Sequence, residues 1–282
     1  MTRSARRTRW TMQSAGAGTA AALLIMTGCS SDDSSSSSAS DSSTSPSGSA
    51  SASTAPNLSG EVTVFAAASL QDSFEALGEQ FEQAHPEVTV TFSFGGSDAL
   101  AASITGGAPA DVFASASPRT MQIVTDAGDA EGTPATFARN QLEIATLPGN
   151  PENIDSLEDL TNPDLTVVLC DEAVPCGAAA QTALDEAGLE LTPASYAEDV
   201  RSALNSVVLK EADAAVVYQT DVLAAGDDVE GVEFPEASEA INDYPITLLR
   251  EAPNASAAEA FIELVRSAEG QQVLIDAGFL QP

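Results

Sequence analysis

Two serines stand where small residues follow an apolar run. Ser69 ends the sequence VFAAAS and Ser97 ends the sequence FSFGGS, and each leads into residues with helical spacing. A serine hydroxyl and the unpaired N–H groups at the start of a helix donate hydrogen bonds to an anion without any lysine or arginine. The two junctions therefore indicate a small-anion site. Serine is also a common helix cap, so one junction alone indicates no more than a helix start.

The same serines raise the alternative of a hydrolase that uses Ser69 or Ser97 as nucleophile. The sequence has no G-x-S-x-G elbow, P-loop, Rossmann glycine pattern or zinc spacing. A Ser–His–Asp triad would need His85, the single histidine, which precedes Pro86 and is expected at the surface where a helix ends. We therefore expect no enzyme, no catalytic residue and no cofactor, and keep the hydrolase as the less favoured alternative.

Short strands alternate with amphipathic helices along the part of the chain that carries these serines. Strands are expected at 61–66, 88–94, 112–115, 142–147, 166–169, 214–218 and 244–249, and Leu70, Phe74 and Leu77 recur at helical spacing between the first two. This alternation predicts an α/β fold with mainly parallel sheets. In such sheets ligands bind beyond the carboxyl ends of the strands, where both serines stand.

The N-terminal part has the features of export and tethering. Residues 1–28 combine four arginines with the apolar run AAALLIM and the small residues before Cys29, which resembles a bacterial lipoprotein signal. We expect a signal peptide at 1–28, lipidation of Cys29 and a disordered serine-rich tether over 29–59, and hence a domain held at the outer face of the cell membrane. An ordinary secretory signal with an incidental cysteine is the alternative.

The charge of the chain excludes two classes of partner. Removal of residues 1–28 leaves six basic residues against 42 acidic ones, a formal charge of −36. No basic surface is available to neutralise phosphates, so nucleic acid is excluded as a partner. Direct adhesion to anionic lipid headgroups is disfavoured for the same reason.

Three cysteines are present, and lipidation of Cys29 would leave Cys170 and Cys176 as a pair. Outside the cytoplasm such a pair is expected to form a disulfide that closes a short loop. A metal site made by protein side chains is disfavoured because His85 lies far from both cysteines.

Five stretches in order resemble the motifs of the periplasmic molybdate-binding proteins of ABC transporters. These are VTVFAAASLQDSF, FSFGGSDALAASITGGAPADVFASA, VPCGAAAQTAL, AEDVRSAL and AAVVYQTDV, and the resemblance spans about residues 60–282. It implies a type II Venus-flytrap fold with two lobes and two crossover segments. Lobe I would hold residues 60–140 and 241–282, and lobe II residues 141–240.

The resemblance also implies which residues bind the ligand. Ser69 and Ser97 would each donate from the hydroxyl and the backbone N–H, Cys176 and Val200 from the backbone N–H, and Tyr218 from its phenol. The ligand would be molybdate, with tungstate as a second cargo, delivered by a monomer to the permease and ATPase subunits of an importer. The chain departs from the family at Cys176, where alanine is usual, and at Gly95 and Gly96, where serines are frequent. A receptor for sulfate, thiosulfate or another tetrahedral oxyanion remains an alternative.

Overall fold

The computed structural model describes residues 57–282. The predicted signal peptide at 1–28, the lipidation site Cys29 and the predicted tether apart from residues 57–59 lie outside the described residues. No helix of the described part is both long enough and apolar enough to cross a membrane.

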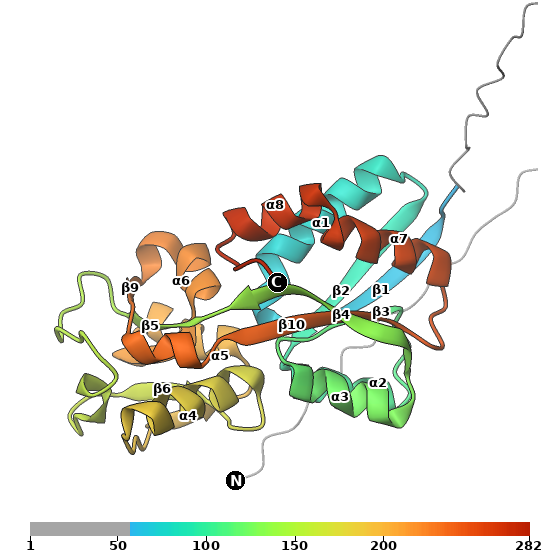
Figure 1. Ribbon diagram of the computed structural model, residues 1–282. Coiled ribbons are helices and arrows are strands. Elements are labelled where there is room, and N and C mark those ends of the chain that lie inside the picture. Colours follow the sequence, from blue (N-terminus) through green and yellow to red (C-terminus); the bar gives the residue numbers. More distant parts are fainter. Residues whose placement is uncertain (1–56) are drawn as a thin grey trace, which may run out of the picture. The chain divides into compact units, whose positions relative to one another are not determined.

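One lobe is built on a five-stranded sheet with helices on both faces (Figure 1). The strand order is β2-β1-β3-β10-β4. The strands are β1 (Gly60–Ala67), β2 (Val88–Gly95), β3 (Val112–Ala114), β4 (Ala130–Asn140) and β10 (Asn242–Leu249). The helices are α1 (Gln71–Ala84), α2 (Ser97–Thr105), α3 (Pro118–Ala127), α7 (Ala255–Arg266) and α8 (Ala268–Asp276). We call this unit lobe I.

The core of lobe I explains the placement of its helices. Helices α1, α7 and α8 cover one face of the sheet, and α2 and α3 cover the other (Figure 1). Phe74 of α1 packs against Phe261 of α7 with ring centroids 6.0 Å apart, whereas Leu100 and Met121 belong to a separate cluster on the opposite face. Burying an apolar stripe from each helix on both faces leaves only the strand ends free for a ligand.

The other lobe, called lobe II here, has the strand order β7-β6-β8-β5-β9. Its strands are β5 (Leu142–Thr146), β6 (Val167–Cys170), β7 (Ser195–Ala197), β8 (Ala214–Tyr218) and β9 (Glu230–Val232). Its helices are α4 (Pro175–Ala187), α5 (Val200–Val208) and α6 (Gln219–Ala225). The chain passes between the sheets twice, at Gln141 and over 233–241.

The two-lobe α/β fold expected from the sequence is confirmed, but both sheets are mixed rather than mainly parallel. Strand β10 is antiparallel to β3 and β4, and β5 is antiparallel to β8 and β9. Each of these two strands arrives from the other lobe, so it starts at the interlobe side and runs away from it. The parallel strands β1, β2, β6 and β8 instead end on that side, and helix starts from both lobes meet there.

Candidate anion-binding site

A small cavity lies between the ends of the two sheets. Its walls come from both lobes and contain all five residues that the sequence singled out: Ser69, Ser97, Cys176, Val200 and Tyr218. The remaining lining residues are Ala67, Ala68, Gly95, Gly96, Ala116, Val174, Pro175 and Asp199. Among residues 57–282, no lysine or arginine lines this cavity.

The lobe I wall consists of two helix starts with small side chains. Ser69 lies in a 3₁₀ turn (Ala68–Leu70) between β1 and α1, and Ser97 is the first residue of α2. Both serines are almost fully buried, with 4% and 1% of their surface exposed. The alanines and glycines beside them are small, so little side-chain bulk separates the helix-start N–H groups from the cavity.

The lobe II wall adds two more helix starts and a strand end. Cys176 is the second residue of α4, Val200 is the first residue of α5, and Tyr218 ends β8. N–H groups in the first turn of a helix have no acceptor within that helix. The positive dipole ends of α4 and α5 from lobe II and of α2 from lobe I lie at the cavity, an arrangement that favours a bound anion.

Each of the three hydroxyls that line the cavity has a protein partner behind it. The Ser69 hydroxyl lies 2.8 Å from the phenol oxygen of Tyr244, and the Ser97 hydroxyl accepts from the N–H of Ala116 at 3.0 Å. The phenol oxygen of Tyr218 accepts from Nδ2 of Asn242 at 2.6 Å. None of these partners is a general base such as histidine or a carboxylate. The geometry therefore gives the serines no route to nucleophilic activation.

Two of these partners, Asn242 and Tyr244, were missed by the sequence analysis, as was Asn140. Nδ2 of Asn140 lies 3.4 Å from the phenol oxygen of Tyr244 and donates to Thr220 at 2.8 Å. The polar residues at 140 and 242 flank the points where the chain changes lobe, which is the one local signal that could have drawn attention to them.

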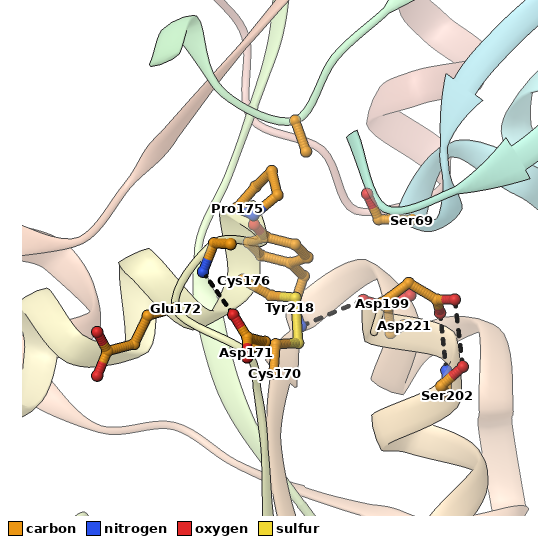
Figure 2. Close-up of a disulfide and its surroundings, with 12 residues drawn as sticks. Ser69, Cys170, Asp171, Glu172, Pro175, Cys176, Asp199, Ser202, Tyr218 and Asp221 are labelled. Carbon is orange, nitrogen blue, oxygen red and sulfur yellow. Dashed lines mark hydrogen bonds between the residues drawn. A yellow bond between two sulfur atoms is a disulfide. The ribbon is translucent and has the colours of Figure 1, made fainter. Parts of the chain in front are cut away.

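The electrostatics of the site keep its phenols protonated. Burial raises the pKa of Tyr218 well above its usual value of 10, and burial likewise raises the pKa of Tyr244. Both phenols are therefore hydrogen-bond donors at any physiological pH. Asp199 also lines the cavity, and its carboxylate caps α5 by accepting from the N–H and the hydroxyl of Ser202 (Figure 2).

The disulfide lies at the start of α4 (Figure 2), and one of its two cysteines, Cys176, lines the cavity. Cys170 and Cys176 are joined by a disulfide with Cα atoms 5.8 Å apart, which ties the end of β6 to the first turn of α4. Gly177 permits this tight turn, since a Cβ there would lie 2.0 Å from the carbonyl oxygen of Asp171. The bridge thus fixes the helix start that carries the Cys176 N–H.

Contacts between the lobes lie beside the cavity. Arg201, which follows Val200, pairs with Asp72 of α1 in lobe I and with the buried Asp221 of lobe II. On another side, the guanidinium of Arg119 donates to the carbonyl of Ala173 at 2.6 Å. These contacts describe a closed clamshell in which nearby arginines are engaged outside the cavity.

Two acidic residues lie near the helix starts of lobe I. The start of α1 has no side-chain cap, because Ser69 pairs with Tyr244 and Asp72 pairs with Arg201. One carboxylate oxygen of Asp98 is buried without a hydrogen-bond partner, and Asp98 does not line the cavity. Within residues 57–282, no cluster of three or more histidine, cysteine or acidic side chains could hold a metal ion.

The match to a protein family covers nearly all of the described chain. The model of the bacterial extracellular solute-binding proteins matches residues 62–280. This chain belongs to that family. A solute-binding protein captures its ligand without converting it, so the expectation that the chain is not an enzyme is confirmed.

Comparison with individual relatives identifies a smaller group within this family to which the chain is similar. It is 43% identical over 221 residues to the molybdate-binding protein ModA of Mycobacterium tuberculosis, covering 78% of this chain and 85% of the relative. It is 33% identical over 230 residues to the molybdate-binding protein ModA of Escherichia coli, covering 78% and 89%. The resemblance to molybdate-binding proteins of ABC transporters is thereby confirmed.

Solved structures agree on the fold. The periplasmic molybdate-binding protein of Azotobacter vinelandii superposes with a TM-score of 0.69 at 22% identity, covering 78% of this chain and 99% of that one. The sulfate-binding protein SubI of M. tuberculosis gives 0.67 at 19% identity, covering 78% and 86%. At these identities the likeness supports the fold of this solute-binding protein and says nothing of its ligand.

Proposed function

We propose that this protein captures molybdate, and also tungstate, in the interlobe cavity and delivers it to the permease and ATPase subunits of an ABC importer. The proposal is carried by the convergence of five residues from five separate segments on one cavity: Ser69, Ser97, Cys176, Val200 and Tyr218. The other lining residues are neutral except for Asp199, whose carboxylate caps α5. The molybdate-binding relatives support the choice of ligand.

The site can hold a tetrahedral dianion through seven donors. Ser69 and Ser97 contribute a hydroxyl and a backbone N–H each, Cys176 and Val200 one N–H each, and Tyr218 its phenol. A hydrogen bond to a charged group contributes about 1.5–3 kcal/mol. After desolvation of the dianion and the loss of its freedom, several such bonds suffice for micromolar or tighter binding, about −8 kcal/mol.

The negative charge of the chain does not oppose this binding at short range. Surface carboxylates are screened beyond a Debye length of about 8 Å at physiological salt. The donors act at hydrogen-bond distance in a site that excludes water. Tungstate shares the shape and charge of molybdate, so the same donors accommodate it.

We further propose that the protein works as a monomer held at the outer face of the cell membrane. Lipidated Cys29 would provide the anchor, and the serine-rich segment that follows would let the binding domain reach the permease. One lobe would comprise residues 60–140 and 241–282, and the other residues 141–240. Hinge motion at the two crossings, near Gln141 and over 233–241, would move the lobes apart and release the ligand.

A thermal-shift panel followed by titration calorimetry tests the ligand assignment. The purified domain is expected to be stabilised by molybdate and tungstate, with saturable binding, and to respond far less to sulfate or phosphate. Stabilisation by sulfate or thiosulfate in preference to molybdate would assign the protein to another oxyanion. No saturable binding of molybdate near neutral pH would overturn the proposal.

A further inference from the structure

We propose that Arg201 is a positioning residue that joins the two lobes in the closed state and thereby slows the release of the bound anion. The inference rests on the proposed function, because it concerns how long the same cavity keeps its ligand. Arg201 is the second residue of α5 and directly follows Val200. Its side chain is 22% exposed, whereas the other arginines and the lysine of residues 57–282 are exposed.

Arg201 forms two ion pairs through different nitrogens of its guanidinium group. Nε lies 3.1 Å from Oδ1 of Asp221, a fully buried residue of lobe II. Nη2 pairs with Oδ2 of Asp72, the second residue of α1 in lobe I. Because a guanidinium group has five N–H donors, it can serve both carboxylates at once. In residues 57–282, the pair with Asp72 is the only ion pair that connects the lobes.

The two ion pairs differ in their dependence on closure. Arg201 and Asp221 belong to the same lobe, so their pair persists when the lobes separate. Nε of Arg201 and Oδ1 of Asp221 are buried and have no hydrogen-bond partner in the described part of the chain, so each is compensated by the charge of the other. Asp221 therefore holds the guanidinium in place before the lobes meet, and Arg201 loses little side-chain freedom when Asp72 arrives.

The charged residues are attached to segments that line the cavity. Asp72 follows Ser69 by three positions, and α5, which begins at Val200, contacts the turn that holds Ser69. The carboxylate of Asp221 accepts from the N–H of Tyr218 at 3.2 Å. The closure that brings these segments around an anion is thus the same movement that forms the interlobe ion pair.

An ion pair of this kind acts on release rather than on capture. The open protein lacks the contact between Asp72 and Arg201, so an entering anion has no such contact to break. Opening of the closed lobes, in contrast, must separate the two residues. The side chain of Asp72 is 58% exposed, and ion pairs of such exposure contribute modestly, which corresponds to about two- to fivefold in the dissociation rate.

The charge of Asp72 gives the prediction a distinctive sign. A carboxylate near an anion site repels the anion, so its removal should by itself strengthen binding. If Asp72 instead holds Arg201 across the lobes, its removal speeds release and weakens binding. The direction of the change therefore separates the two effects.

The test follows dissociation by chasing bound radiolabelled molybdate with an excess of unlabelled molybdate. Asp72→Asn is expected to release molybdate about two- to fivefold faster than the unchanged protein, at a nearly unchanged association rate. Asp72→Glu keeps the charge and should restore slow release. Working above the pKa of Asp221, which burial raises to about 7, keeps that carboxylate charged.

Asp98→Asn is the matched control. Asp98 is the second residue of α2, as Asp72 is of α1, and it lies in the same lobe but forms no ion pair with any described residue. Its replacement removes the same charge and should not speed release. Added salt should bring the rates of Asp72→Asn and the unchanged protein closer together, because the ion pair is screened.

A double variant shows whether Asp72 acts through Arg201. Arg201→Gln should also release molybdate faster, and adding Asp72→Asn to it should cause no further acceleration. Release from Asp72→Asn at the rate of the unchanged protein, or an acceleration that persists in full beside Arg201→Gln, would overturn the inference while molybdate binding stood. Failure of the unchanged protein to bind molybdate would instead overturn the proposed function on which the inference rests.

Discussion

The phenol oxygen of Tyr244 lies 2.8 Å from the hydroxyl oxygen of Ser69, although the two residues are 175 positions apart in the chain. Both side chains are almost completely buried. The pairing explains why Ser69 does not cap α1 and why its hydroxyl is held at the edge of the cavity. The hydroxyl of a capping serine bonds to backbone N–H groups of its own helix, whereas the hydroxyl of Ser69 bonds to a tyrosine that lies far away in the sequence.

Replacing Ser69 by alanine is expected to weaken molybdate binding by about 1–3 kcal/mol, because one charge-assisted hydrogen bond is lost. Titration calorimetry measures the change. Ser73→Ala is the matched control: Ser73 is equally buried in α1, but its hydroxyl bonds to the carbonyl of Leu70 and does not line the cavity. Equal affinities for the two variants would remove Ser69 from the binding site.

Gly96→Ala is expected to hinder closure of the lobes. A Cβ at position 96 would lie 2.7 Å from the carbonyl oxygen of Glu198 in lobe II, and this distance is too short for an ordinary contact. Small-angle X-ray scattering with saturating molybdate should therefore show a less compact particle than the unchanged protein, and affinity should fall. Gly95→Ala is the comparison for closure, since no atom lies within 4 Å of a Cβ there. Full compaction of Gly96→Ala would contradict the close approach of the lobes.

Removal of the cystine is expected to cost both stability and affinity. The bridge closes a loop between residues six positions apart, and the chain-entropy model gives about 2 kcal/mol for a loop of this size. The double variant Cys170→Ser, Cys176→Ser should unfold at lower urea concentration and bind molybdate more weakly, because the start of α4 loosens.

Reducing agent provides the control for this prediction. It should lower the stability of the unchanged protein toward that of the double variant and leave the double variant as it is. Unchanged unfolding after complete reduction would show that the bridge contributes nothing to this loop.

The order of motifs in the sequence was enough to predict the five lining residues, whereas it did not predict the residues that form hydrogen bonds with them. The strand at 214–218 was predictable because its run AAVVY is apolar throughout, as suits a strand buried on both faces. Strand β4 was missed because Gly132 and Pro134 interrupt it and polar residues fill its outer part. Strands β7 and β9 are three residues long, too short for a period to show.

The site partners were missed for a different reason. Asn242 contacts Tyr218 and Ala116, 24 and 126 positions away, and Asn140 contacts Tyr244 across 104 positions. No local pattern encodes such contacts, because they exist only once the chain has crossed between the lobes twice. The roles of Ser69, Ser97, Cys176, Val200 and Tyr218 in binding remain predictions.

The pH dependence of stability is the last prediction, and it centres on Glu143 in β5. Burial, and after it the nearby carboxylate of Glu233, raises the pKa of Glu143 from 4.5 to about 7. The folded state therefore retains a proton that the unfolded chain releases between these values. The free energy of unfolding should fall as the pH rises from about 4.5 to 7 and level off above it. Asp221, whose pKa burial raises from 3.8 to about 7, acts with the same sign.

Glu143→Gln should make this decline shallower, because the amide has no proton to release, and the variant should be more stable than the unchanged protein above pH 7. Urea unfolding across the pH range measures both effects. Glu233→Gln, which removes only the secondary cause, should change the slope less. Glu143 does not line the cavity, so molybdate affinity should stay as it is in both variants. A slope in Glu143→Gln equal to that of the unchanged protein would show that Glu143 ionises alike in the folded and unfolded states.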